Sequence, residues 1–213
     1  MNKNEKFVIT INREMGSGGR TVGRKLAEKL GVSFYDKAVI KGLAEKYHLS
    51  VEEFERLKGR KQGWWADFKR IVRIGDPMAV SYYIPKMGEE PEMLTTDEMF
   101  KVEKEILNGI ADEESCVLAG RAAFFVLRNH PNHLSILIQA SMPFRVARTL
   151  RKQQGITEEE ALKTLKLVDK MRENYVNKYT KTSRYDTRNY DLVIRADGKT
   201  EDEIVDIIMR YIG

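Results

Sequence analysis

A glycine-rich turn between an apolar strand and an amphipathic helix constrains this chain more than any other feature. Residues 7–11 are apolar or β-branched, which is typical of a buried strand, and apolar residues recur at helical spacing over residues 22–30. Three glycines lie between these segments: Gly16, Gly18 and Gly19. The sequence therefore predicts a strand, a glycine loop and a helix that ends at Gly31.

A loop of this kind can hold phosphate oxygens, because its backbone N–H groups and the positive end of the helix dipole converge on one point. The alternative is that the glycines only serve a tight turn, although each of them adds conformational freedom to the unfolded chain. In the pattern G-x-x-x-x-G-K-[ST], Arg13 takes the place of the first Gly and Gly19 that of the Lys. In G-x-G-x-x-G, Thr21 takes the place of the last Gly, so neither pattern decides the ligand.

Length and composition indicate one globular domain with insertions. The chain has 213 residues, of which 42% are hydrophobic and 32% charged, and its net charge of +5 suits an acidic ligand. The charge by itself does not separate nucleic-acid contacts from an ordinary basic surface. Because the arginines fall at strand ends and in one hairpin rather than along a continuous surface, a nucleic-acid partner is not expected.

Cysteine and histidine usage adds expectations about compartment and metal. Cys116 is the only cysteine and lies in an apolar run, which predicts a buried side chain and no internal disulfide. The three histidines have no cysteine nearby, so a zinc site is not expected. The amino terminus has no signal-like apolar region and no apolar run approaches 18 residues, so we expect a cytoplasmic protein without a membrane partner.

The remaining elements predict an α/β fold. Four further strands are expected at residues 32–35, 115–119, 134–140 and 191–194, with helices between them. Residues 37–114 show helical patterns and no convincing strand. They contain Trp64 and Trp65, for which packing is favoured over stacking on a base, and a long Pro- and Gly-containing segment over residues 75–93.

Asp36 follows the second strand, 20 residues after Gly16. A dinucleotide-binding fold would use this acid for the adenosine ribose, which supports an oxidoreductase as an alternative. A phosphotransferase would use it near Mg²⁺ or the acceptor, and a purely structural role would be a helix N-cap. The long helical segment after this strand counts against the dinucleotide fold.

Arginines mark three later positions. Arg121 follows the strand at 115–119, at the edge where parallel sheets bind ligands, although a salt bridge to a helix is an equal alternative. The helix after residue 143 carries three arginines at a spacing of three, without an acidic residue at their i+4 positions. They are Arg145, Arg148 and Arg151. Residues 180–189, which include Arg184 and Arg188, are polar and predict an exposed loop.

Taken in order, these motifs resemble the nucleoside monophosphate kinases, and among them the cytidylate kinase-like family. The sequence Gly16-Ser17-Gly18-Gly19-Arg20-Thr21 is similar to the family's G-S-G-K-G-T loop. Tyr35-Asp36 is similar to its strand-end acid, Gly120-Arg121 to its Gly-Arg pair, and Asp169 with Arg172 to its D-x-x-R element. Arg148 and Arg151 look like the arginines of its lid.

The resemblance implies a three-layer P-loop NTPase fold with a five-stranded parallel sheet. The core would comprise residues 1–36, 115–150 and 190–213, the helical monophosphate-binding insert residues 37–114, and the lid hairpin residues 151–189. The activity implied is transfer of the γ-phosphoryl group of ATP, with Mg²⁺, to a small nucleotide, CMP or dCMP.

The resemblance also assigns roles to the residues. The loop from Gly16 to Thr21 would hold the donor phosphates, with the Thr21 hydroxyl in the Mg²⁺ shell. A second group would stabilise charge on the transferring phosphoryl: Arg20, Arg148, Arg151, Arg184 and Arg188. A third group would bind the acceptor: Asp36, Arg121, Asp169 and Arg172.

Three positions depart from the family pattern. Gly19 stands in place of the loop lysine, with Arg20 as the candidate replacement, Ala122 in place of an aspartate and Leu165 in place of an arginine. These departures keep a second function open, a kinase-like nucleotide-binding protein with an altered acceptor or little turnover. The acceptor and the oligomeric state stay open at this point.

Overall fold

The structure is a computed structural model, and it describes residues 1–36 and 97–213. The helices, the tryptophan pair and the long loop expected between residues 37 and 96 lie outside the described residues. The chain divides into two units, one formed by residues 1–36 and 114–213 and the other by residues 37–113.

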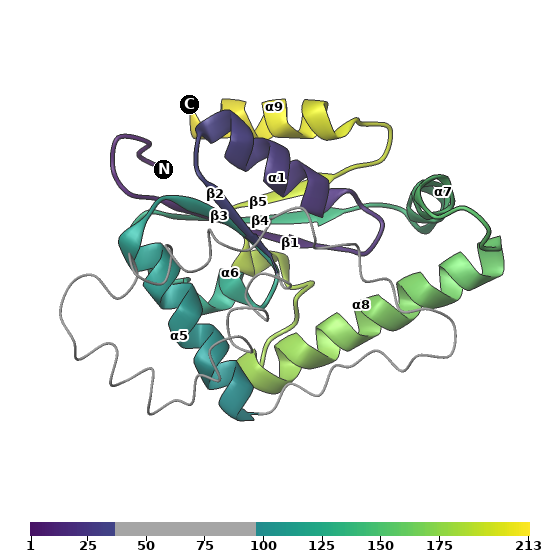
Figure 1. The fold of residues 1–213 in the computed structure, drawn as a ribbon, viewed down its shortest axis with the longest axis horizontal. Coiled ribbons are helices and arrows are strands. Elements are labelled where there is room, and N and C mark those ends of the chain that lie inside the picture. Colours follow the sequence, from purple (N-terminus) through teal and green to yellow (C-terminus); the bar gives the residue numbers. More distant parts are fainter. Residues whose placement is uncertain (37–96) are drawn as a thin grey trace, which may run out of the picture. The chain divides into compact units, whose positions relative to one another are not determined.

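The first unit is built on a five-stranded parallel sheet with the strand order β2-β3-β1-β4-β5 (Figure 1). This confirms the predicted α/β fold and its five parallel strands. The strands are β1 (Val8–Arg13), β2 (Ser33–Asp36), β3 (Cys116–Ala119), β4 (His133–Gln139) and β5 (Leu192–Arg195).

The strand order decides where the loops meet. Strand β1 is central, and its last residue, Arg13, is in register with Ile138 of β4, while Asp36 at the end of β2 is in register with Ala119 of β3. The loops that follow these strands therefore open at the same edge of the sheet. In a dinucleotide-binding fold β2 would lie beside β1, but here β3 lies between them, which counts against the oxidoreductase alternative.

Helices cover both faces of the sheet (Figure 1). Helices α1 (Gly19–Leu30) and α9 (Glu201–Ile212) pack on one face, where Leu26 and Ile208 are fully buried in the main core. Helix α6 (Ala123–Val126) and the C-terminal part of α8 (Glu158–Thr180) form a smaller cluster on the other face. Helix α7 (Met142–Lys152) precedes α8, and a 3₁₀ turn (Thr187–Asn189) precedes β5.

Local sequence signals set the helix ends. Helix α1 ends at Gly31, which has a φ of 67°, a conformation that costs glycine little. Helices α8 and α9 each begin with a capping box, Thr157 with Glu160 and Thr200 with Glu203. The described part of the second unit is α5 (Asp97–Glu113), which agrees with the helical pattern of residues 37–114.

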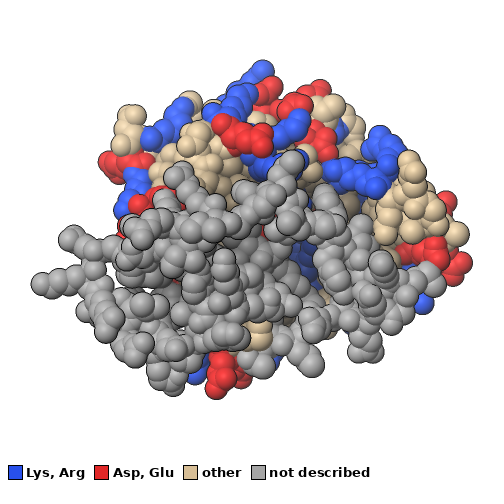
Figure 2. All heavy atoms as spheres, in the orientation of Figure 1, with Lys and Arg blue, Asp and Glu red and all other residues tan. Residues whose placement is uncertain are grey.

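The surface over α1 and α9 carries both signs of charge (Figure 2). Lys25 and Lys29 of α1 pair with Asp202 and Asp206 of α9, each at 2.6 Å. The excess positive charge of the chain is therefore not collected on this face. Cys116 is buried as predicted, and within residues 1–36 and 97–213 no helix is long and apolar enough to cross a membrane.

Candidate functional site

The predicted glycine loop joins β1 to α1 at the carboxyl edge of the sheet. Gly16 and Gly18 have φ angles of 83° and 90°, the left-handed region that a side chain disfavours. A side chain at Gly16 would also be crowded, because a Cβ would lie 3.0 Å from both Cβ and the carbonyl oxygen of Arg145. The two glycines are required by backbone conformation, and Gly16 also by the close approach of α7.

Several N–H groups of this loop have no acceptor among the residues that the structure describes. Met15 N–H donates to the Asp169 carboxylate at 2.9 Å, and Ser17 N–H to the carbonyl of Glu14 at 3.3 Å. Within residues 1–36 and 97–213, the N–H groups of Gly16, Gly18 and Thr21 donate to no protein acceptor. Unpaired N–H groups in a left-handed loop at a helix N-terminus are suited to an anion.

The side chain of Arg20 leaves the loop and pairs with Asp36. Its Nε lies 2.5 Å from Asp36 Oδ2, and Asp36 is almost completely buried at the end of β2. The structure thus brings together two predicted site residues, although the guanidinium group predicted to replace the loop lysine already has a carboxylate partner.

Two predicted site residues, Arg172 and Arg184, gather with Arg145 around the buried carboxylate of a third, Asp169. Asp169 of α8 accepts a hydrogen bond from Arg145 and lies 3.8 Å from Arg172 and 3.6 Å from Arg184. Arg145 also lies 3.2 Å from Glu14. Because Asp169 binds the Met15 N–H as well, this cluster ties the glycine loop to both α7 and α8.

The structure corrects the prediction of an exposed loop over residues 180–189. Arg184 has no exposed surface, and its Nη2 donates to Asn12 Oδ1 at 3.1 Å and to the carbonyl of Arg13. Arg188, by contrast, is 88% exposed and pairs with Asp186 two residues away. The polar composition of the loop concealed this difference, since a guanidinium group can be buried when tertiary contacts supply partners.

Arg13, to which the sequence analysis assigned no role in the site, lies near Arg172 and Arg184. Burial and the neighbouring guanidinium groups of Arg172 and Arg184 lower the pKa of Arg13 to about 9, against a smaller opposing effect of Asp36. Burial and Arg184 likewise lower the pKa of Arg172 to about 10. In both shifts burial is the largest cause, and the neighbouring guanidinium groups add to it.

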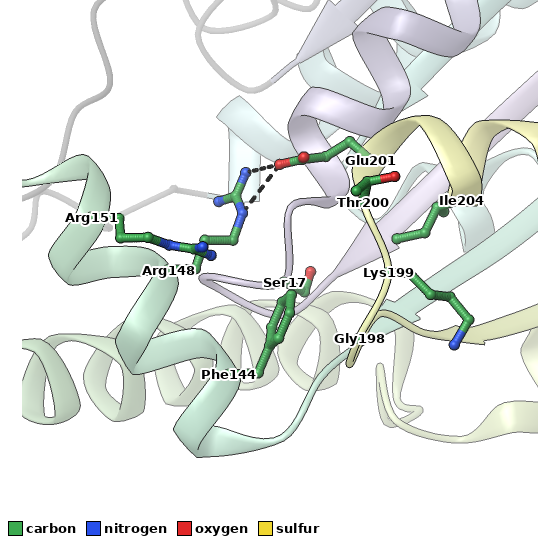
Figure 3. A pocket seen from close by; sticks show the side chains of 9 residues that line it. All are labelled: Ser17, Phe144, Arg148, Arg151, Gly198, Lys199, Thr200, Glu201 and Ile204. Carbon is green, nitrogen blue, oxygen red and sulfur yellow. Dashed lines mark hydrogen bonds and ion pairs between the residues drawn. The ribbon is translucent and has the colours of Figure 1, made fainter.

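Arg148 and Arg151 of α7 line a pocket of about 270 Å³ beside the loop (Figure 3). Arg148 Nη2 lies 2.6 Å from Glu201 at the start of α9 and 3.5 Å from the Thr21 hydroxyl. The pocket is also lined by Ser17, Phe144, Ile204 and residues 198–200. Its volume is slightly below the lower end of the range for small-molecule sites, roughly 300 Å³.

Arg121 lies at the end of β3 in a strained backbone. Gly120, Arg121 and Ala122 have φ angles of 91°, 55° and 54°, three successive residues in the left-handed region. The Arg121 guanidinium lies 5.5 Å from the ring centre of Tyr175 on α8. The predicted Gly-Arg pair therefore lies at the carboxyl edge of the sheet, but the sequence did not indicate the left-handed backbone of Arg121 and Ala122.

The chain is similar in sequence to a known protein family and to known proteins. The sequence profile described as the cytidylate kinase-like family matches residues 8–197. The chain belongs to this family. A cytidylate kinase from Methanosarcina barkeri (strain Fusaro / DSM 804) is 27% identical over 202 residues, which cover 94% of this chain and 93% of that protein.

Solved structures share the α/β fold of this cytidylate kinase-like chain. An uncharacterized protein from Eubacterium ventriosum ATCC 27560 is 25% identical, with a TM-score of 0.69 over 97% of this chain and 98% of the other. Shikimate kinase from Bacteroides thetaiotaomicron is 16% identical, with a TM-score of 0.51 over 98% and 99%, and shows the fold alone. Family and fold together support a nucleotide kinase.

Four residues of this cytidylate kinase-like chain were missed as site residues: Arg13, Glu14, Arg145 and Glu201. Glu14 pairs with Arg145 and also accepts a hydrogen bond from the N–H of Ala140 at 2.9 Å. Glu201 pairs with Arg148 across 53 positions of sequence, and no local pattern joins them. The sequence did contain a signal for Arg13: in the pattern G-x-x-x-x-G-K-[ST], Arg13 stands in place of the first glycine while Gly19 stands in place of the lysine.

Proposed function

We propose that this protein is an ATP-dependent phosphotransferase acting on a nucleoside monophosphate, with CMP and dCMP as the acceptors to test first. The observation that carries the proposal is the set of unpaired loop N–H groups beside an excess of guanidinium groups. Arg13, Arg145, Arg172 and Arg184 are four cations, while the carboxylates paired with them are those of Asp169 and Glu14. Bound phosphates would neutralise this excess.

The donor would lie across the glycine loop. The N–H groups from Gly16 to Thr21 would hold its phosphates, and the pocket lined by Phe144 and Ile204 would receive its base and ribose. Arg148 and Arg151 border both regions and would contact the phosphates or the ribose. The pairing of Arg148 with Glu201 would have to loosen, and this is one way in which α7 could respond to the donor.

The acceptor phosphate would lie at the ends of β2 and β3. Arg121 and Arg172 are the candidate cations, with Asp169 holding Arg172 and Asp36 holding Arg20. Arg188 stays a candidate for the transferring group, although its guanidinium pairs with Asp186 on the surface. Arg184 would act by positioning Arg13 and Asn12 rather than by contact, because it has no exposed surface.

The reaction itself requires positioning and charge neutralisation rather than a general base. A phosphate oxygen of the acceptor forms a bond to the γ-phosphorus while the bond from that phosphorus to the β–γ bridging oxygen breaks. ADP leaves with the electron pair of the broken bond. Arginines at the carboxyl edge would stabilise the charge that develops on both oxygens.

Mg²⁺ is the implied metal, and the residues present are compatible with it in a limited way. Among residues 1–36 and 97–213 no three His, Cys, Asp or Glu side chains gather as a metal site. Mg²⁺ in kinases is bound largely by phosphates and water with few protein ligands, and the Thr21 hydroxyl is the candidate protein donor here. Bound there, the ion would neutralise donor phosphate charge.

The test is ADP formation from ATP and Mg²⁺ in a coupled assay with CMP, dCMP, UMP, AMP and GMP offered separately. ATP without an acceptor is the control, and ATP binding is measured in parallel by titration calorimetry. We expect saturable ATP binding and acceptor-dependent ADP formation. Absence of ATP binding, or ADP formation that no acceptor accelerates, would contradict the proposed activity.

Gly19 in place of a lysine favours a second candidate, a nucleotide-binding protein with little turnover. It predicts ATP binding in calorimetry without acceptor-dependent ADP formation. Under either candidate the partners are small nucleotides, and a cytoplasmic location stays a prediction.

A further inference from the structure

The side chain of Arg13 occupies the space beside the residue that stands in the lysine position. A Cβ added to Gly19 would lie 2.5 Å from Arg13 Cβ and 3.0 Å from its Cγ. Real Cβ atoms essentially never approach so closely, and the β- and γ-carbons of Arg13 are the near end of its side chain rather than its flexible tip. A lysine at position 19 and an arginine at position 13 therefore exclude each other.

The same side chain continues across the sheet edge to Gly120. A Cβ added to Gly120 would overlap the Nη1 of Arg13. The arginine thus runs from the end of β1, past the start of α1, to the end of β3. Glycines at positions 19 and 120 are what leave its path open.

The Arg13 guanidinium differs from other arginines of the site in having no partner of opposite charge. Within residues 1–36 and 97–213 it forms no hydrogen bond and no ion pair, while Arg20, Arg145 and Arg148 each pair with a carboxylate. Asp36 is near enough to affect Arg13 but already binds Arg20 at 2.5 Å. A cation that Asp36 compensates only in part, among other cations, is suited to bind an anion.

We propose that Arg13 supplies the cationic contact to the γ-phosphate of the donor, which must approach the acceptor at the end of β3, in place of the lysine of the G-x-x-x-x-G-K pattern. The first and seventh positions of the loop have then exchanged roles. The cation has moved from the start of α1 to the end of β1, and the glycine has moved the opposite way. This inference rests on the proposed phosphotransferase function, because it assigns a residue of the same site.

The exchange can be reversed by mutation. Arg13→Gly with Gly19→Lys in one chain restores G-x-x-x-x-G-K, and removing Arg13 opens the space that the new lysine requires. We expect this double variant to bind ATP within about tenfold of wild type. Gly19→Lys alone should bind poorly, because its side chain meets Arg13. Arg13→Gly alone should bind poorly, because neither position 13 nor position 19 then carries a cation.

Arg13→Met measures the contribution of the charge while keeping most of the side-chain length. Loss of a charge-assisted hydrogen bond should weaken ATP or tripolyphosphate binding about 10- to 100-fold in calorimetry and lower kcat roughly 100-fold or more. Arg24→Ala is the matched control, because Arg24 lies on α1 with its side chain 61% exposed and pairs only loosely with Glu28. Circular dichroism melts establish that each variant is folded.

The outcomes separate the two proposals. If Arg13→Met binds ATP as tightly as Arg24→Ala, or if the folded double variant binds no better than Arg13→Gly, the assignment of Arg13 is wrong while the phosphotransferase function stands. If the wild-type chain itself binds no ATP, both are wrong. If the wild type binds ATP without turnover, the same comparisons of ATP affinity in calorimetry still support or contradict the role of Arg13.

Discussion

Replacement of Asp169 by asparagine tests whether one buried carboxylate holds the site together. Asp169 is 7% exposed, and three guanidinium groups surround it. Asparagine is nearly isosteric and keeps an oxygen for the Met15 N–H, but it removes the negative charge. The arginines are then left buried with less compensation, and breaking a buried ion pair costs about 3–5 kcal/mol.

The lower end of this range is expected, because Arg145 keeps its second carboxylate, Glu14, at 3.2 Å. A free energy of unfolding lowered by about 3 kcal/mol corresponds to a urea midpoint lowered by about 1 M, with an m-value near the upper end of the usual range, about 3 kcal/mol per M. Equilibrium urea unfolding followed by tryptophan fluorescence and circular dichroism measures the change.

The matched control is Asp202→Asn. Asp202 also pairs with a cation at 2.6 Å, Lys25, but its side chain is 73% exposed, so the expected loss is about 0–1 kcal/mol. If both variants unfold at the same urea concentration, Asp169 is not the carboxylate that compensates the buried arginines. The electrostatic account of the site would then be refuted.

Three further predictions concern stability. Burial lowers the pKa of His133 to about 4 from an ordinary 6.5. As the pH decreases, the unfolded chain therefore binds a proton before the folded chain does, and the free energy of unfolding should fall by about 3 kcal/mol between pH 6.5 and 4. An NMR titration midpoint of His133 near 6.5 would contradict this. Gly16 and Gly31 both have a positive φ, so an alanine at either position should lower the free energy of unfolding by about 1–2 kcal/mol. Gly16→Ala should cost more in urea unfolding, because only its Cβ would also meet Arg145. Thr200→Ala removes the N-cap of α9 and should lower the free energy of unfolding by about 1 kcal/mol in thermal melts, and an unchanged melt would show that the cap contributes nothing.

The sequence determined the local elements of this protein. Side-chain periodicity gave the five strands within one or two residues at most ends, and Thr157 with Glu160 and Thr200 with Glu203 gave two helix starts that the structure contains. The glycine loop was also predictable, because left-handed backbone at Gly16 and Gly18 needs residues of that type. These features depend on neighbours within a few positions along the chain.

Pairings between distant residues were decided only by the tertiary structure. The order β2-β3-β1-β4-β5 separates β2 from β1, and periodicity carries no information about which strands are neighbours. Arg184 was expected on an exposed loop and is fully buried, because Asn12 and the carbonyl of Arg13, more than 170 positions away, accept its hydrogen bonds. Composition describes what a side chain prefers on average, whereas burial depends on which partners the fold supplies.

Arg13 combines both kinds of information. The sequence shows an arginine in a glycine position and a glycine in a lysine position, as two separate departures from one pattern. Only the folded chain shows that they are one feature, because the side chain of the first fills the space that the second leaves open. The sequence gives the two residue types, but only the tertiary structure shows that the Arg13 side chain lies where a side chain at position 19 would be.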